Sequence, residues 1–209
     1  MENVMQTIAV YAIPVLFAIT VHEASHGYVA RMFGDNTAYV LGRVTLNPIK
    51  HIDPIGTIVL PLGMALFTPF IFGWAKPVPV DWNSLRHPKR DMIWVAAAGP
   101  GVNLVMAILW AILFSLLTMF GVQERFFYEV AQAGVSVNLV IMALNLLPIP
   151  PLDGGRIVAG LLPRKLSNAY SRIEPFGLFI IVGLLVTGAL SVVLQPLLAI
   201  GAAIVRIFA

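Results

Sequence analysis

The chain of 209 residues contains no cysteine and few charged residues. The lack of cysteine excludes disulfide bridges and thiolate metal sites, so a bound metal would need His, Asp, Glu or carbonyl ligands. Charged residues make up 11% of the chain, against about 25% in an ordinary soluble domain. Together with 59% hydrophobic residues and a mean hydropathy of +0.89, this composition predicts an integral membrane protein.

The sequence also lacks an internal repeat and a low-complexity linker. Its length leaves room for one helical domain, so we expect a single domain over residues 1–209. The opening residues MENVMQ carry no basic cluster, which argues against a removable signal peptide. The net charge of +3 is small and its basic residues lie between apolar segments, which favours the lipid bilayer rather than nucleic acid as a partner.

Five apolar segments follow one another, at about residues 8–30, 55–73, 92–120, 130–149 and 175–208. A helix needs about 20 apolar residues to cross a bilayer, so the first, third and fourth segments are predicted spans. The last segment exceeds one crossing, and the dipeptide Gln195-Pro196 is predicted to kink or divide it. The expected fold is an α-helical, polytopic membrane protein built as a helical bundle.

Basic residues predict the orientation of this bundle. They gather in three loops, whereas Arg125 in the loop between the third and fourth segments is balanced by Glu124. By the positive-inside rule the three basic loops are cytoplasmic and the N-terminus lies outside, as in a bacterial inner membrane. The segment 55–73 lies between two of these loops and contains Pro61, Gly63 and Pro69. It is therefore predicted to be re-entrant rather than a full crossing, although its apolar length would also fit a crossing.

The most informative stretch is VHEASHGY, at the end of the first span. Residues four apart lie on one face of a helix, so His22 and His26 can point at a single metal ion while Glu23 lies beside it. Such polar residues are costly inside a membrane unless a function or a partner compensates, which favours a metal site over two helix-end histidines.

A catalytic zinc usually has three protein ligands, so a third must come from elsewhere. Position 32, where a soluble three-histidine motif would continue, holds Met32. His51 and Asp53 follow in the next loop, but Asp53 precedes a proline at the start of an apolar segment and is better placed to cap a helix. Asp153 is the stronger candidate, because the fourth span ends at prolines just before it and delivers it to the cytoplasmic side. Alternatively, Asp153 is part of a simple turn.

Three motifs in order resemble the site-2 protease family of intramembrane zinc metalloproteases. They are HEASH, then AAAGPGVN with Gly99, Pro100 and Asn103, and then NLLPIPPLDGG with Asn145, Pro148, Asp153 and Gly154. The resemblance covers about residues 15–160 and is that of a short, bacterial-type member without a PDZ domain. It implies that His22, His26 and Asp153 bind Zn²⁺ and that Glu23 activates water. It also implies a catalytic role for Asn145, which positions the substrate or polarises its carbonyl. The Gly-Pro-x-x-Asn element is interpreted as helix packing without chemistry.

The segment TAYVLGRVTLNP, residues 37–48, alternates in part and is rich in β-formers. Related proteases have a membrane-associated sheet at this place, so a small β element is expected here. An unwound transmembrane substrate would then add as a strand along Val40, Leu41 and Gly42, although an ordinary amphipathic hairpin fits equally well.

The sequence therefore predicts a zinc metalloendopeptidase that hydrolyses peptide bonds in or near transmembrane segments of membrane proteins. Two other functions use the same residues: a metal-binding transporter or sensor, and a catalytically silent scaffold. A transporter needs a path of further intramembrane acidic or histidine residues, which the spans barely offer. A scaffold has no use for Glu23 between the two histidines.

Overall fold

The computed structural model describes residues 2–67 and 73–208, and every regular element in these residues is a helix. Four helical segments are long and apolar enough to cross a membrane: Met5–Met32, Pro88–Met119, Arg125–Asn145 and Arg164–Val186. The first three are the long helices α1 (Glu2–Met32), α4 (Pro88–Met119) and α5 (Arg125–Asn145). These three match the spans predicted from the apolar segments, so the structure indicates a multi-pass membrane protein.

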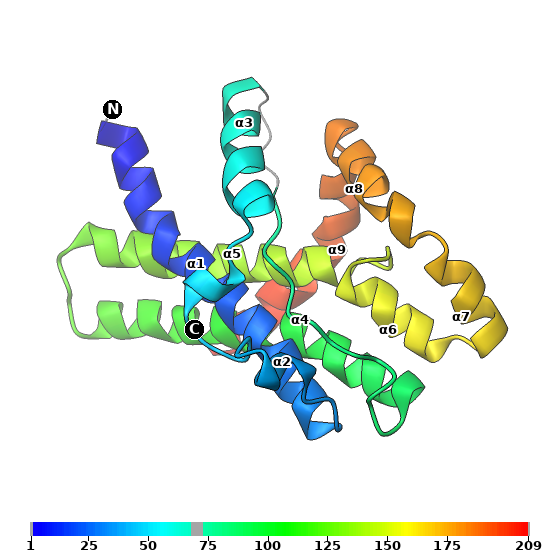
Figure 1. The fold of residues 1–209 in the computed structure, drawn as a ribbon. Coiled ribbons are helices and arrows are strands. Elements are labelled where there is room, and N and C mark those ends of the chain that lie inside the picture. The colour runs from blue at the N-terminus through cyan, green and yellow to red at the C-terminus, as the bar shows by residue number, and fades with distance from the viewer. Residues whose placement is uncertain (1, 68–72, 209) are drawn as a thin grey trace.

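The long helices α1, α4 and α5 form the core of the molecule. Helices α4 and α5 lie side by side and are joined by a tight turn at Gly121, while α1 crosses them at a steep angle (Figure 1). Small residues let the helices approach closely: Gly134 lies so near Trp110 that an added Cβ would come within 2.3 Å of the indole. Without a solvent-driven hydrophobic effect between helices in lipid, such close packing has to hold the bundle together.

The C-terminal third returns to this core. It contains α6 (Asp153–Leu161), α7 (Arg164–Ser171), the 3₁₀ turn η3 (Glu174–Phe176), α8 (Gly177–Val186) and α9 (Ala189–Val205). Helix α9 packs through Val205 against Ala107 of α4 and Leu139 of α5.

Of the kink or division predicted at Gln195-Pro196, the division is wrong, because α9 runs through Pro196. The chain divides instead between α8 and α9, at Gly188 with φ +73°. Glycine adopts this left-handed conformation without a steric penalty, and a glycine in this conformation commonly ends a helix.

The predicted small β element over residues 37–48 is also wrong. Residues Thr37–Val40 form the short helix α2, which is followed by a turn and irregular chain. The Asp35 carboxylate accepts hydrogen bonds from the backbone N–H and the hydroxyl of Thr37, which favours a helical start. At the other end Gly42 has φ +63°, and the amides of Gly42 and Arg43 bond back to the carbonyls of Tyr39 and Ala38. This is a glycine-terminated helix end, and local capping outweighs β-propensity here.

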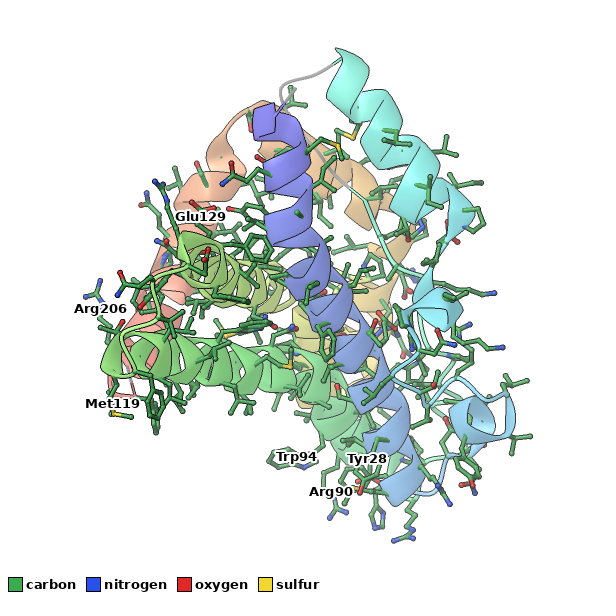
Figure 2. The ribbon with its side chains drawn as sticks, turned by 90° about the vertical axis from the view of Figure 1, so that its left-hand side faces the viewer. Tyr28, Arg90, Trp94, Met119, Glu129 and Arg206 are labelled. Carbon is green, nitrogen blue, oxygen red and sulfur yellow. The ribbon has the colours of Figure 1, made fainter. Side chains whose placement is uncertain are left out.

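The predicted re-entrant segment 55–73 lies partly outside the described residues. Its described part contains the π-helical turn η2 (Pro54–Val59) and α3 (Leu60–Phe67), which stands apart from the core helices (Figures 1 and 2). The two ends of the segment lie next to each other, because Trp74 N–H donates to the Gly56 carbonyl over 3.1 Å. The Thr57 hydroxyl donates to the Trp74 carbonyl over 2.8 Å. The chain therefore comes back to the place from which η2 starts.

Candidate metal centre

Two histidines of α1 and one aspartate of α6 converge on a single point. His22 Nε2 lies 3.1 Å from His26 Nε2 and 3.2 Å from Asp153 Oδ2, and the distance from His26 Nε2 to Asp153 Oδ2 is 3.4 Å. Both histidines are buried, at 5% and 9% exposure. Among the described residues these three form the group whose ligand atoms could hold a metal ion. The helix spacing of four thus brings the histidines together as predicted, and the chain supplies Asp153 from 127 residues further on.

The two rings turn the same nitrogen toward this point. His22 Nδ1 lies 2.6 Å from Asn103 Oδ1, and His26 Nδ1 lies 2.7 Å from the Val95 carbonyl oxygen. Both partners can only accept, so each ring has a proton on Nδ1, and Nε2 is the nitrogen available to a metal ion. Asp153 Oδ2 is buried and receives no hydrogen bond. A cation at the point where the three meet would satisfy this oxygen.

The geometry fits zinc. Zinc binds imidazole nitrogen at about 2.0–2.1 Å in a tetrahedron, which separates neighbouring ligand atoms by about 3.3 Å. The three observed separations of 3.1, 3.2 and 3.4 Å match this spacing. Three protein ligands leave a fourth position open, which is typical of a catalytic rather than a structural zinc. Imidazole and carboxylate ligands also suit other divalent metals, but this small set is one that zinc hydrolases use.

Helix α4 leaves room for the site at Gly99. A Cβ added at Gly99 would lie 2.5 Å from both His22 Cε1 and His26 Nε2. No side chain larger than hydrogen fits at this distance without displacing a ligand. The glycine of the Gly-Pro-x-x-Asn element therefore does more than pack helices, because it borders the metal centre directly.

The loop before α6 places Asp153 as the first residue of that helix. Gly154 and Gly155 lie against the backbone of this loop: an added Cβ would come within 2.3 Å of the Leu146 carbonyl at Gly154 and within 2.5 Å of Pro150 N at Gly155. The aspartate is thus held at a helix start rather than in a free turn.

Glu23 is held by a segment far away in the sequence. Its Oε2 accepts a hydrogen bond of 2.8 Å from the backbone N–H of Val78. Val78 belongs to the irregular segment 73–81, whose carbonyls at Lys76 and Pro77 accept from Arg43 Nη2. The carboxylate therefore has a fixed orientation on α1, next to the two histidines, without being one of the three converging ligands.

The other predicted site residues, Asp53, His51 and Asn145, are each engaged in a local hydrogen bond. Asp53 accepts from the amides of Ile55 and Gly56 and caps η2, as expected of it. His51 is buried and its Nε2 donates to the Thr45 carbonyl. Asn145 is the last residue of α5, where its amide donates to the Ile141 carbonyl. Neither Asp53 nor His51 joins the cluster of three.

The residues expected to bind the substrate as a strand lie at the exposed end of α2. Val40 and Leu41 are 78% and 62% exposed, and Gly42 forms the turn that follows them. They have no strand geometry, so the described residues offer no sheet here to which a substrate strand could add.

Sequence reasoning missed Asn103. Its Oδ1 contacts His22, although the motif that contains it was interpreted as packing alone. The sequence did contain a signal for its role, because a polar amide inside a predicted span is costly, as are the histidines of the first span.

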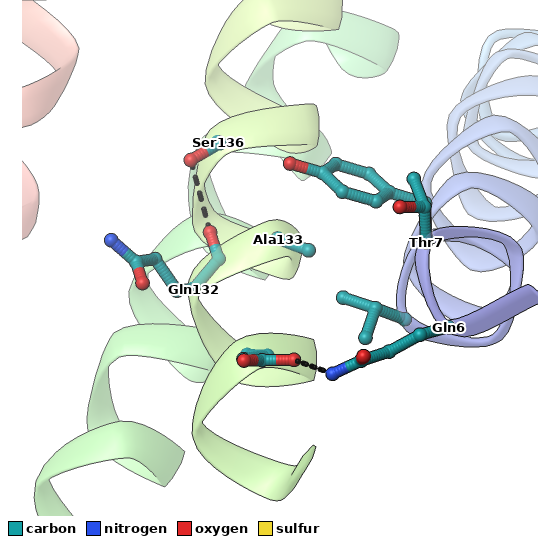
Figure 3. Close-up of a pocket in the computed structure, with 8 residues that line it drawn as sticks. Gln6, Thr7, Gln132, Ala133 and Ser136 are labelled. Carbon is teal, nitrogen blue, oxygen red and sulfur yellow. Dashed lines mark hydrogen bonds between the residues drawn. The ribbon is translucent and has the colours of Figure 1, made fainter. Parts of the chain in front are cut away.

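A cavity in the described residues is separate from the metal centre. It measures about 460 Å³ and lies between the start of α1 and α5, with Gln6, Thr7, Gln132 and Ser136 on its walls (Figure 3). Gln6 Nε2 closes one end by donating to Glu129 Oε2 over 3.1 Å. Its last α1 residue, Tyr11, precedes His22 by eleven positions, or about 16 Å along a helix.

The contact of Gly99 with both histidines leads to a steric prediction. Gly99→Ala should push a methyl group into the ligand atoms and lower zinc affinity by about tenfold or more, as measured by competition with a chelating dye. The matched control is Gly101→Ala on the same helix, because nothing lies within 4 Å of a Cβ there. Equal zinc affinities of the two variants would refute the close approach at Gly99.

Comparisons with known proteins agree with this chemistry. The family model described as peptidase family M50 matches residues 127–188, which include Asn145 and Asp153. The protein named "Putative zinc metalloprotease YwhC", from Bacillus subtilis, is 37% identical over 198 residues, or 90% of this chain and 85% of that protein.

Mycobacterial relatives are longer than this chain. The "Putative zinc metalloprotease Rip2" of Mycolicibacterium smegmatis is 32% identical over 84% of this chain and 66% of its own length. The protein of the same name from Mycobacterium tuberculosis is 32% identical over 82% of this chain and 63% of its own length. No solved structure matches the chain significantly. The extent of the match to the Bacillus protein, with the family model over the aspartate motif, shows that the chain belongs to peptidase family M50, the site-2 protease family.

Proposed function

We propose that this M50 peptidase is an intramembrane protease, which hydrolyses peptide bonds in or near transmembrane segments of membrane proteins. One observation carries the proposal: two of the three ligands, His22 and His26, lie inside a helix that is long and apolar enough to cross a membrane. His22 and His26 precede the end of the span at Met32 by ten and six residues, or about 15 and 9 Å. A peptide bond must therefore reach the site at the depth of the bilayer.

The proposed roles follow from the geometry. His22, His26 and Asp153 would hold the zinc, which when bound lowers the pKa of water and polarises the scissile carbonyl. Glu23 would take the proton of the attacking water and return it to the leaving amine. Its hydrogen bond to Val78 N–H supports this role, because it holds the carboxylate on one side of the helix without binding it to a cation.

We assign Asn145 to the substrate on the strength of the family resemblance. It ends α5 eight residues before Asp153, at the start of the loop that carries this ligand to the site. Its Nδ2 is engaged with the Ile141 carbonyl, which leaves the oxygen of the same amide free to meet a peptide N–H. We further treat residues 1–209 as one domain, because α9 packs back onto α4 and α5.

The proposed orientation places the metal centre toward the cytoplasm, in a bacterial inner membrane. Exposed aromatic residues support an interface at this end: Tyr28 and Trp94 are 60% and 59% exposed, and Trp94 lies one helical turn from Arg90 on α4 (Figure 2). Aromatic and basic side chains gather in this way where a helix leaves the bilayer on the cytoplasmic side. The contact between Gly56 and Trp74 supports a re-entrant segment, whose two ends lie on the same side of the membrane.

Exchange of the proposed general base should separate catalysis from metal binding. Glu23→Gln is expected to retain zinc while the hydrolysis rate falls by at least about 10²–10⁴, the usual worth of acid–base catalysis. Bound zinc and cleavage of a transmembrane peptide are measured on the same purified samples in detergent.

His22→Ala is the matched variant and should lose zinc and activity together. Normal cleavage by Glu23→Gln would rule out the general-base role. Zinc binding by the unmodified protein without cleavage of any membrane peptide would favour a metal carrier.

The topology can be tested with single cysteines, since the chain has none of its own. Ser84 lies in a predicted cytoplasmic loop and Gln123 in the predicted external loop, and both are exposed. Ser84→Cys should resist an impermeant thiol reagent added to intact cells, whereas Gln123→Cys should react readily. Rapid labelling at position 84 would mean that residues 55–73 cross the membrane.

The substrate proposal predicts a dependence on helix stability. A transmembrane helix hides its carbonyls in internal hydrogen bonds, so it must unwind before water can attack. Gly, Pro or Asn near the cut lower the cost of unwinding, and their replacement by Leu should slow cleavage. Turnover is compared between peptides that differ only at these positions. Unchanged rates would indicate that cleavage takes place in an already extended flanking region.

A further inference from the structure

A chain of buried polar side chains leads away from His22 through three helices. His22 Nδ1 of α1 meets Asn103 Oδ1 of α4 at 2.6 Å, and Asn103 Nδ2 donates to Asn138 Oδ1 of α5 at 2.9 Å. Asn138 Nδ2 in turn donates to the Gly134 carbonyl at 2.8 Å. Both asparagines are completely buried, at 0% exposure. Buried amides in an apolar bundle are costly unless every group is satisfied, so a network of this kind calls for a purpose.

Backbone carbonyls determine which way both amides face. Asn103 Nδ2 also donates to the Ala18 carbonyl at 3.3 Å, and a carbonyl can only accept. If Asn103 were turned round, its oxygen would face the oxygens of Ala18 and Asn138. Asn138 cannot turn to accommodate it, because its own oxygen would then face the Gly134 carbonyl. Two main-chain oxygens thus leave a single arrangement in which all donors meet acceptors.

We propose that Asn103 is a positioning residue that fixes the tautomer of the zinc ligand His22, and that Asn138 holds Asn103 in the required orientation. In the single allowed arrangement Asn103 presents an oxygen to Nδ1, so the ring keeps a proton there and directs Nε2 toward Asp153 and the metal position. The proposal rests on the zinc site of the proposed function, but it does not depend on the nature of the substrate.

A neutral amide suits this place better than a carboxylate. Many zinc-bound histidines donate their second N–H to a carboxylate, which makes the ligand more basic. Here the acceptor is completely buried, where an unpaired charge would be expensive. The amide supplies the same directional acceptor without a charge, and its own two donors are both used.

The two histidines differ in how they are held. His26 donates to the Val95 main-chain carbonyl, which no side-chain substitution removes. Loss of Asn103 should therefore disturb one ligand of three and weaken zinc binding rather than abolish it. Partners of metal-bound histidines are typically worth about 10- to 100-fold in metal affinity.

The test uses leucine variants of the two asparagines in the full chain, purified in detergent. The zinc dissociation constant is measured by competition with a chelating dye, and the thermal unfolding of the metal-free protein is measured in parallel. Asn103→Leu should raise the zinc dissociation constant by about 10- to 100-fold and also lower the unfolding temperature, because Asn138 loses its partner. Asn138→Leu should lower the unfolding temperature with a smaller effect on zinc, because the Ala18 carbonyl still orients Asn103.

The double variant Asn103→Leu/Asn138→Leu distinguishes positioning from packing. Replacement of both partners by apolar groups removes the unsatisfied amide, so the unfolding temperature should recover relative to Asn103→Leu. Zinc affinity should stay low, because His22 Nδ1–H still has no acceptor. Recovery of zinc affinity together with stability would overturn the proposal and leave Asn103 as a packing residue.

A measurement on the unmodified protein does not depend on whether the variants fold. Nitrogen-15 NMR of labelled histidine in the zinc-loaded chain should show His22 with its proton on Nδ1 and the metal on Nε2, the signal being assigned by through-bond correlation to the His22 backbone. Zinc on Nδ1 would overturn the proposal. Zinc binding through Nε2 by a chain that cleaves no membrane peptide would refute the proposed protease and leave this inference intact.

Discussion

Three ligand atoms, within 3.1–3.4 Å of one another in a buried part of the bundle, are the constraint on which the rest of the site depends. A shared cation would satisfy Asp153 Oδ2, which is buried and has no hydrogen-bond donor. The surroundings serve to maintain the arrangement. Acceptors at both Nδ1 atoms turn each Nε2 toward the centre, and Gly99 keeps carbon atoms away from it. Metal binding and the local fold are therefore coupled.

The site and the helix packing share one face of α4. Ala96, Gly99, Asn103 and Ala107 recur at intervals of three or four residues, all of them buried, so they form a single stripe along the helix. Small residues on such a stripe let membrane helices approach closely. On α4 the same stripe leaves space for the metal ligands at Gly99 and supplies a hydrogen-bond acceptor at Asn103. A substitution that improves packing here by adding volume would therefore distort the geometry of the metal centre.

Much of this organisation could be predicted from the sequence, because the strongest signals are local. Apolar length predicts α1, α4 and α5, and the spacing of His22 and His26 predicts a shared ligand face. The wrong or missing predictions have two causes: local effects of single residues that outweigh a general propensity, and contacts between residues far apart in the sequence. Capping by Asp35 and Gly42 outweighed the β-propensity of residues 37–48, and Gly188 rather than Pro196 divided the last helices. The contact from His22 to Asn103 spans 81 positions, which no local pattern encodes.

Glu23 shows how far the candidate site depends on loops that look incidental in the sequence. Its carboxylate is oriented by Val78 N–H, and Arg43 bonds the carbonyls of the two residues before Val78. Gly27 lies under the same segment, where an added Cβ would meet Val44 at 2.8 Å and Val78 at 3.0 Å. The metal ligands are held from within the bundle, by α4 and α6, whereas the proposed general base is held from the loop side. The same segment also reaches the metal side, because Val80 packs in the cluster that contains Val95, whose carbonyl accepts from His26.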